Sequence, residues 1–202
     1  MPTDPVTAIA TYPLNALLAL VFGIVWVGAE AYARRATFRQ GADRHPSSQL
    51  DRRSYPLIGV ALGIGLAVSV LAFLFGVGGY FPAWVAGVGV ALLVVGIPTR
   101  VWALTTLGRF FTMPITLRSD HEIVEQGPYR WIRHPAYTGG FLMAVGMSLL
   151  LLTPVGFAVT FAGLLGAYIF RIYAEEAVLV SRFGDDYRRY RTRTWRLVPW
   201  IY

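Results

Sequence analysis

Residues 55–75 read YPLIGVALGIGLAVSVLAFLF and contain no charged side chain. A helix needs about 20 mostly apolar residues to cross the hydrocarbon layer of a bilayer, so this stretch alone predicts a membrane-spanning helix. The whole chain of 202 residues agrees, because 55% of its residues are hydrophobic and only 14% are charged. Soluble domains carry about 25% charged residues, and disordered chains have low hydrophobicity. Both classes are therefore excluded.

Four further apolar segments accompany this one. They cover residues 14–33, 81–104, 137–152 and 154–173. The segment 137–152 is short for a span, so we expect it to form a tight hairpin with the segment that follows it. The sequence therefore predicts an all-α fold, a polytopic membrane helix bundle of about five transmembrane helices.

The basic residues indicate how this bundle is oriented. All 18 are arginines, and they occur within residues 34–53, 100–133 and 171–196, which fall at one end of the predicted bundle. By the positive-inside rule these segments face the cytoplasm, so we expect the N-terminus outside and the C-terminus in the cytoplasm. The exclusive use of arginine suggests a GC-rich bacterial genome. We therefore expect an integral protein of a bacterial cytoplasmic membrane, with its active site on the cytoplasmic side.

The composition also excludes several kinds of chemistry. Cysteine and lysine are both absent, which excludes a thiolate metal site, a cysteine nucleophile and a lysine Schiff base. His121 and His134 have no partner cluster at a zinc-ligand spacing, so we expect no metal. The net charge of +7 fits the anionic headgroups of membrane lipids, and the hydropathy argues against a nucleic-acid partner. Gly87 and Gly89 lie inside an apolar run, which favours close helix packing over a nucleotide-binding loop.

Polar chemistry gathers first in residues 119–140, which read SDHEIVEQGPYRWIRHPAYTGG. Gly127-Pro128 is a turn signal, and Pro135 suits the first turn of the helix that follows. A helix that begins near His134 would present free backbone N–H groups and a positive dipole end, which favour a carboxylate. The alternative is an aromatic belt at headgroup level, although such a belt needs neither two histidines nor a Gly-Pro turn.

A second polar segment, residues 170–190, reads FRIYAEEAVLVSRFGDDYRRY. Arg171 and Glu175 share a helix face because they are four residues apart. In a helix that begins at Pro154, Glu175 lies about 30 Å along the axis, at the cytoplasmic edge of the bilayer. Ionisable groups there are functional candidates, although an ordinary ion pair with a snorkelling arginine explains the spacing equally well. Residues 185–202 predict a basic amphipathic tail along the membrane surface.

The two polar segments together resemble a known family. The motif GPYRWIRHPAYTG at residues 127–139, followed by RxxxEExxLxxxFGxxYxxY at residues 171–190, is similar to the isoprenylcysteine carboxyl methyltransferase family, and the related phospholipid methyltransferases share this C-terminal plan. The resemblance covers residues 119–199. It implies a membrane-embedded methyltransferase that uses S-adenosylmethionine without a Rossmann fold, in a cytoplasmic pocket closed by the C-terminal segment.

The resemblance also implies roles for individual residues. The cofactor contacts that it implies are His121, Glu122, Ile123, Val124, Tyr129, His134, Pro135, Ala136, Tyr137, Glu175 and Glu176. Arg171 matches a substrate-contacting arginine, and Arg171, Glu175 and His134 are the expected catalytic residues. The implied acceptor is lipophilic or lipidated, with an isoprenylcysteine-like carboxylate first among the candidates. A carboxylate is already deprotonated at pH 7 and needs no general base, whereas an amine or thiol would need His134 or Glu175.

These inferences divide the chain and leave alternatives open. Residues 1–104 would form three N-terminal transmembrane helices, and residues 105–202 the catalytic part, with a cytoplasmic loop, a helix hairpin at 137–183 and the basic tail. A phospholipid or thiol methyltransferase remains possible. So does an NADPH-dependent sterol-type membrane reductase, although the adjacent Glu175 and Glu176 favour a methyltransferase. The third alternative is a membrane module without enzymatic activity, such as a lipid binder or an assembly subunit.

Overall fold

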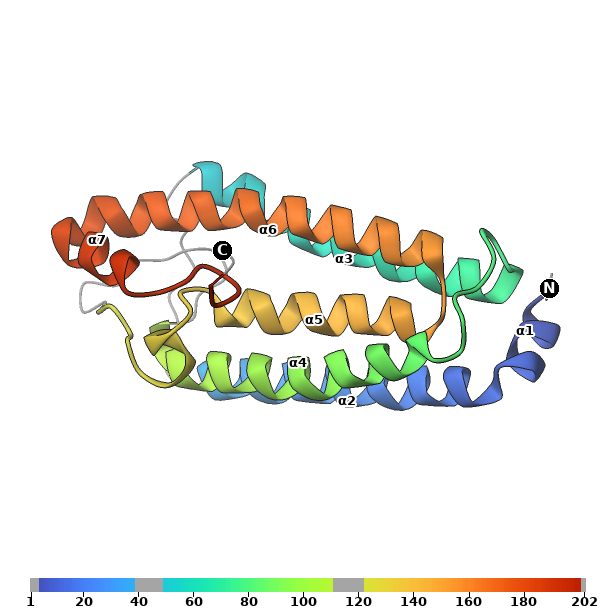
Figure 1. The fold of residues 1–202 in the computed structure, drawn as a ribbon. Coiled ribbons are helices and arrows are strands. Elements are labelled where there is room, and N and C mark those ends of the chain that lie inside the picture. Colours follow the sequence, from blue (N-terminus) through green and yellow to red (C-terminus); the bar gives the residue numbers. More distant parts are fainter. Residues whose placement is uncertain (1–3, 39–48, 111–121, 201–202) are drawn as a thin grey trace.

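The computed structural model describes residues 4–38, 49–110 and 122–200. Long helices lie side by side and give the molecule the shape of an elongated bundle (Figure 1). The helices are α1 (Pro5–Thr11), α2 (Pro13–Phe38), α3 (Gln49–Phe75), α4 (Val85–Leu107), α5 (Pro135–Leu150), α6 (Pro154–Phe183) and α7 (Asp185–Thr192), with 3-10 turns η1 (Gly108–Phe110) and η2 (Gly127–Arg130). The described ranges contain helices and one isolated β-bridge but no strand, which confirms the predicted all-α fold.

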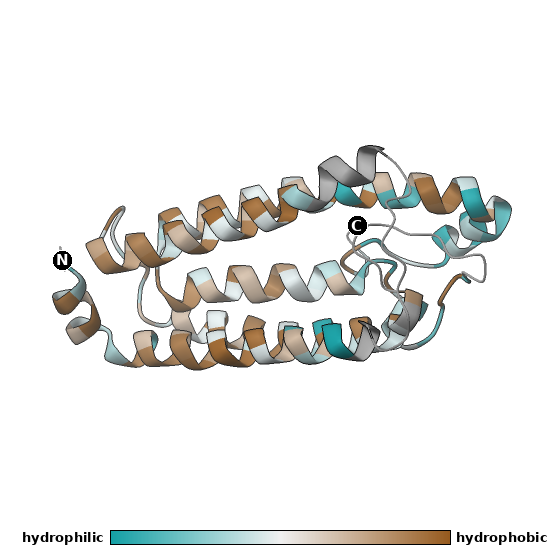
Figure 2. Cartoon of the chain, turned by 180° about the vertical axis from the view of Figure 1, so that it is seen from behind, coloured by the Kyte–Doolittle hydropathy of each residue, from teal (hydrophilic) through white to brown (hydrophobic). Residues whose placement is uncertain are grey.

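Four of the helices are long and apolar enough to cross a membrane. Their apolar parts are Pro13–Arg35, Pro56–Phe75, Val85–Leu107 and Pro154–Phe183. Figure 2 shows that hydrophobic residues dominate the length of the bundle and that hydrophilic residues collect at the end opposite the N-terminus. The predicted membrane bundle is therefore confirmed, whereas the side of the membrane that each end faces stays a prediction.

Helix α5 is the short fifth member of the bundle. Its 16 residues span about 24 Å, less than the roughly 30 Å of a hydrocarbon layer. It lies among the longer helices (Figure 1), and most of its residues are buried. The chain then turns inside the protein, where the Asn15 side chain donates to the Leu150 carbonyl at 2.8 Å and the Phe81 amide donates to the Leu152 carbonyl at 2.8 Å. Because protein groups satisfy these two carbonyls, α5 can end in the protein interior.

Glycines let α4 approach α5 closely. A Cβ atom on Gly89 would lie 2.5 Å from the Leu150 nitrogen and 2.6 Å from the Gly146 oxygen. A Cβ atom on Gly146 would in turn lie 2.8 Å from the Gly89 oxygen. These are backbone atoms that a rotamer change cannot move. Gly89 is thus a helix-packing residue, as the sequence interpretation favoured, and this contact fixes the position of α5.

We expect Gly89→Ala to lower the stability of the folded protein by about 2 kcal/mol or more, because the added methyl group overlaps the backbone of α5. Gly87→Ala is the matched control on the same helix. A Cβ atom there meets nothing within 4 Å, and alanine favours a helix over glycine by up to about 1 kcal/mol. Thermal unfolding in detergent measures both variants, and equal melting temperatures would contradict the close contact.

Candidate active site

The polar site lies where α5 begins, α6 ends and the C-terminal segment folds back (Figure 1). Pro135 occupies the first turn of α5 and His134 precedes it as the N-cap residue, as the sequence predicted. Residues 193–197 run beside residues 131–134. The Arg133 amide donates to the Trp195 carbonyl at 2.7 Å and the His134 amide to the Arg196 carbonyl at 3.0 Å. The start of α5 is therefore held by the end of the chain.

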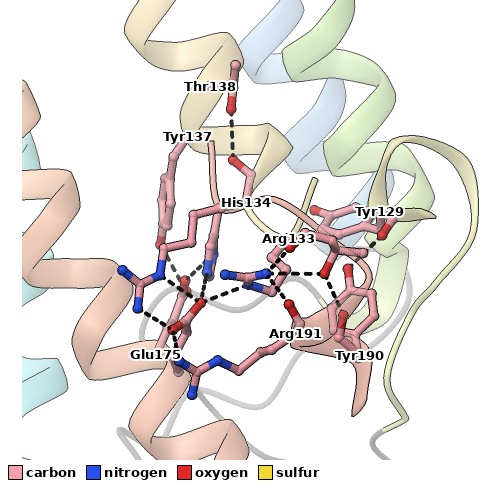
Figure 3. Close-up of polar contacts among 11 residues, drawn as sticks. Tyr129, Arg133, His134, Tyr137, Thr138, Glu175, Tyr190 and Arg191 are labelled. Carbon is pink, nitrogen blue, oxygen red and sulfur yellow. Dashed lines mark hydrogen bonds and ion pairs between the residues drawn. The ribbon is translucent and has the colours of Figure 1, made fainter. Parts of the chain in front are cut away.

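Glu175 is the centre of one group of contacts (Figure 3). The Tyr137 hydroxyl donates to Glu175 Oε1 at 2.9 Å, and His134 Nδ1 lies 3.3 Å from Glu175 Oε2. The side chain of Glu175 is 21% exposed. Three residues that the resemblance assigned to the site thus come together, and the Glu175 side chain at their centre is partly exposed.

Arg171 approaches the same group from one turn earlier on α6. Its Nε donates to the Tyr137 hydroxyl at 3.3 Å and lies 3.8 Å from Glu175 Oε1. Only 2% of the side chain is exposed. A snorkelling arginine would extend to the water, so this one is a buried cation of the site. The i,i+4 spacing therefore reflects an interior cluster and not a surface ion pair.

Glu176 faces a different set of partners. Its carboxylate receives Arg133 Nε at 2.9 Å and Arg196 Nη2 at 3.1 Å, and Arg191 Nη2 lies 3.6 Å away. The side chain is 5% exposed. The resemblance assigned Glu176 to the cofactor, whereas these contacts favour a structural role in which one carboxylate fastens the loop before α5 and the C-terminal segment to α6.

His134 connects the two carboxylates. Burial by itself would lower the pKa of this histidine, but the nearby carboxylates of Glu175 and Glu176 outweigh it and raise the pKa above the usual value. Nδ1 is the nitrogen that faces Glu175. Nε2 lies 3.6 Å from Glu176 Oε1, and this buried atom has no hydrogen-bond partner within the described part of the chain. A buried nitrogen without a hydrogen bond is costly, so Nε2, whose contact with Glu176 is an ion pair, is a candidate donor to a bound molecule.

A second group of the expected cofactor residues lines a separate cavity. Glu122, Ile123 and Val124 border a cavity of about 320 Å³ between residues 122–126 and the end of α4. The side chain of Arg193 bridges to Glu125, which joins this border to the C-terminal segment. The prediction for His121 falls outside the described residues.

Tyr129 and Ala136 lie in the protein interior near this cavity. Both belong to one buried apolar cluster that also contains Ala103 and Leu104, and Val124 packs against it. The Tyr129 carbonyl accepts a 2.6 Å hydrogen bond from the Tyr190 hydroxyl of α7. Burial raises the pKa of the Tyr129 hydroxyl, so this group stays neutral. Tyr129 and Ala136 therefore belong to the apolar packing next to the site. Pro135 is also fully buried.

Sequence reasoning overlooked Arg133, Arg191 and Arg196. The first lies inside the quoted motif, and the other two lie in the tail that was expected along the membrane surface. Instead, Tyr187, Tyr190 and Leu197 of this segment are buried, and Thr138 donates to the Leu197 carbonyl at 2.7 Å. The sequence did contain a signal for these arginines, because two adjacent glutamates at the end of an apolar helix need cationic partners.

Comparisons with known proteins indicate one family. Residues 89–181 match the model of the isoprenylcysteine carboxyl methyltransferase (ICMT) family. A protein-S-isoprenylcysteine O-methyltransferase of Saccharomyces cerevisiae is 35% identical over 56% of this chain and 48% of its own length. The Tribolium castaneum protein of that name is 32% identical over 58% of this chain and 43% of its own. Protein-S-isoprenylcysteine O-methyltransferase B of Arabidopsis thaliana is 31% identical over 72% of this chain and 77% of its own.

A solved structure gives the same result. The eukaryotic intramembrane Ras methyltransferase ICMT aligns with a TM-score of 0.55 and 28% identity, over 73% of this chain and 52% of that one. The chain spans about half the length of the insect and yeast relatives. The match includes 43% of the insect protein and 48% of the yeast protein. The Arabidopsis relative is matched over more than two thirds of its length. The chain therefore belongs to the isoprenylcysteine carboxyl methyltransferase family.

Proposed function

We propose that this protein is a membrane methyltransferase that transfers the methyl group of S-adenosylmethionine to the carboxylate of a lipophilic, isoprenylcysteine-like acceptor. The observation that carries the proposal is the group formed by Arg171, Glu175 and His134, in which a partly exposed Glu175 side chain and a buried His134 nitrogen without a hydrogen bond meet at the end of an apolar bundle. The names of the relatives supply the reaction class.

The described residues fit the proposed methyl donor, which supplies an electrophilic sulfonium methyl group when it is bound. Glu175 offers a charge-assisted acceptor for an ammonium group or for hydroxyl groups. The ring of Tyr137 stacks on Tyr168 with centroids 5.0 Å apart, which gives an aromatic wall of the kind that cations favour. Glu122, Ile123 and Val124 border the cavity that would hold the remainder of the donor.

The apolar surface of the bundle fits a lipophilic acceptor. A groove of about 760 Å³ runs between α2 and α3, with apolar side chains along most of its length and Glu30 and Arg34 among its lining residues. A hydrocarbon chain in this groove would leave its polar end on the side of the bundle where α5 begins. Arg171 would then orient the acceptor carboxylate. No residue has to remove a proton, because a carboxylate is ionised at pH 7.

The remaining work of the chain is to hold both molecules and exclude water. The C-terminal segment covers the start of α5 through the Arg133–Trp195 and His134–Arg196 backbone hydrogen bonds. Methyl transfer is an in-line displacement, so most of the rate gain comes from holding donor and acceptor in a reactive orientation. We further propose that residues 105–202 are the catalytic part and that the arginine-rich end faces the cytoplasm. The arginine-only composition supports a bacterial cytoplasmic membrane.

The test is a calorimetric titration of the detergent-purified protein with S-adenosylhomocysteine, followed by an assay with radiolabelled S-adenosylmethionine. We expect saturable binding and transfer of label to an S-prenylated cysteine that carries a free carboxylate. Phosphatidylethanolamine and a small thiol are the comparison acceptors, and preferred labelling of either would replace the carboxylate in the proposal. Absence of S-adenosylhomocysteine binding together with thermal stabilisation by NADPH would contradict the methyltransferase and favour a reductase.

A further inference from the structure

An ion pair joins two helices in the apolar interior of the bundle. Glu30 is the one acidic residue in the sequence of α2, and Arg100 is the one charged residue in that of α4. Arg100 Nη2 donates to Glu30 Oε1 at 2.9 Å and Arg100 Nε to Oε2 at 3.2 Å, which makes the pair bidentate. The two side chains are only 13% and 17% exposed. Charges inside membrane helices are costly and usually serve a function.

Arg100 makes a third bond, and this one reaches the candidate site. Its Nη1 donates to the carbonyl oxygen of Ala136 at 2.9 Å. Ala136 lies in the first turn of α5, between His134 and Tyr137. The guanidinium group is a rigid plane, so the two bonds to Glu30 determine where Nη1 points. The pair therefore holds a backbone atom that is one residue from Tyr137 and two from His134.

Two glycines that follow the first turn of α5 lie close to neighbouring helices. A Cβ atom on Gly139 would lie 2.6 Å from the backbone nitrogen of Arg100, and one on Gly140 would lie 2.7 Å from the Tyr168 hydroxyl. The ring of Tyr168 also stacks on Tyr137. The start of α5 is thus held from both α4 and α6. On the α4 side, the hydrogen bond from the Arg100 side chain to the Ala136 carbonyl supplies this contact.

We propose that Arg100, held in place by Glu30, is a positioning residue that fixes the first turn of α5 so that His134 and Tyr137 face Glu175. The expected consequence is tighter binding of the methyl donor, and this part of the inference rests on the proposed function. Glu30 also accepts a hydrogen bond from Arg34 Nε at 3.1 Å, and that arginine is 45% exposed. The network therefore extends from the edge of the apolar groove to the backbone beside the site.

The decisive measurement is the titration of His134 by NMR in protein with isotope-labelled histidine. The sequence has three histidines, and a His134→Gln spectrum assigns the signal. Arg100→Lys keeps the charge but loses the planar fork, and Arg100→Gln removes the charge. Loss of a positive charge alone would raise the pKa of His134. Loss of positioning separates His134 from Glu175, so we expect both variants to lower that pKa toward its usual value of 6.5.

The second readout is the affinity for S-adenosylhomocysteine, which we expect to fall about tenfold or more in both variants, the change that corresponds to one hydrogen bond to a charged group. Gly65→Ala is the control for a general loss of stability. It forces a Cβ atom to within 2.7 Å of Thr160 Oγ1 at the α3–α6 contact, and it should lower the melting temperature without moving the His134 titration.

An unchanged pKa of His134 in folded Arg100→Lys, or a raised pKa in Arg100→Gln, would overturn the positioning role. The failure of the proposed function is a separate result. If the wild-type protein does not bind S-adenosylhomocysteine, the methyltransferase proposal fails, whereas the His134 titration still decides whether Arg100 positions the start of α5.

Discussion

Glu175→Ala should weaken the binding of S-adenosylhomocysteine by about 100-fold or more and abolish methyl transfer. Glu175 accepts a hydrogen bond from the Tyr137 hydroxyl at 2.9 Å and faces His134 Nδ1 at 3.3 Å, so its removal takes one partner from each of these rings. It also leaves the cation of Arg171, which is 2% exposed, without its carboxylate partner on the same helix face. Calorimetric titration of the purified variant measures the loss.

Two further variants show whether this loss belongs to the site. Glu175→Gln keeps the shape and an oxygen acceptor for Tyr137, so it should bind more weakly than the wild type but more strongly than the alanine variant. Asp185→Ala removes a carboxylate that is 79% exposed and pairs with Arg188, and it should bind normally. Wild-type affinity in a folded Glu175→Ala protein would eliminate Glu175 as a cofactor contact.

Glu176→Ala should cause the largest loss of stability, about 3–5 kcal/mol, as is typical when one partner of a buried ion pair is removed. Arg133, Arg191 and Arg196 all converge on this one carboxylate, and Arg133 is itself only 8% exposed. Without Glu176 the three cations repel one another. We therefore expect a lower melting temperature and faster tryptic cleavage after the arginines of residues 191–196.

The control for this prediction is Asp186→Ala. Asp186 is 68% exposed and pairs with Arg189 on the surface of α7, so its loss should change the stability by less than about 0.5 kcal/mol. Similar melting temperatures and cleavage rates for the two variants would show that Glu176 does not fasten the C-terminal segment. Loss of donor binding in Glu176→Ala at an unchanged melting temperature would instead support the direct cofactor contact that the resemblance implied.

The sequence predicted the membrane helices well because hydropathy is a local property. It also predicted that α6 ends at Phe183, although the apolar run stops near residue 173. Glu175 and Glu176 end the apolar pattern but do not break a helix, because glutamate is a good helix former. The helix ends at Gly184, which has a positive φ of 55° that glycine adopts without strain.

The contacts that hold the site could not be predicted in the same way. Glu30 and Arg100 are far apart in sequence, and so are Arg133 and Glu176, so no spacing rule brings them together. The tail was expected on the membrane surface because its composition is basic and aromatic. The structure instead buries Tyr187 and Tyr190 and gives the nearby arginines a buried carboxylate, which is a tertiary effect. The motif order placed both glutamates in the predicted site, but it did not indicate that the Glu175 side chain is more exposed than that of Glu176.

The short helix α5 has a practical consequence for topology experiments. A count of helices that are long enough to cross a bilayer gives four, an even number that would place both chain ends in one compartment. Helix α5 runs back along the bundle between α4 and α6, so counting it as a fifth pass reverses this parity, and α1 and α7 lie at opposite ends of the bundle (Figure 1). Reporter fusions at the two termini should therefore give opposite signals, and a reporter joined after α5 would be misread by anyone who overlooks a helix enclosed by protein.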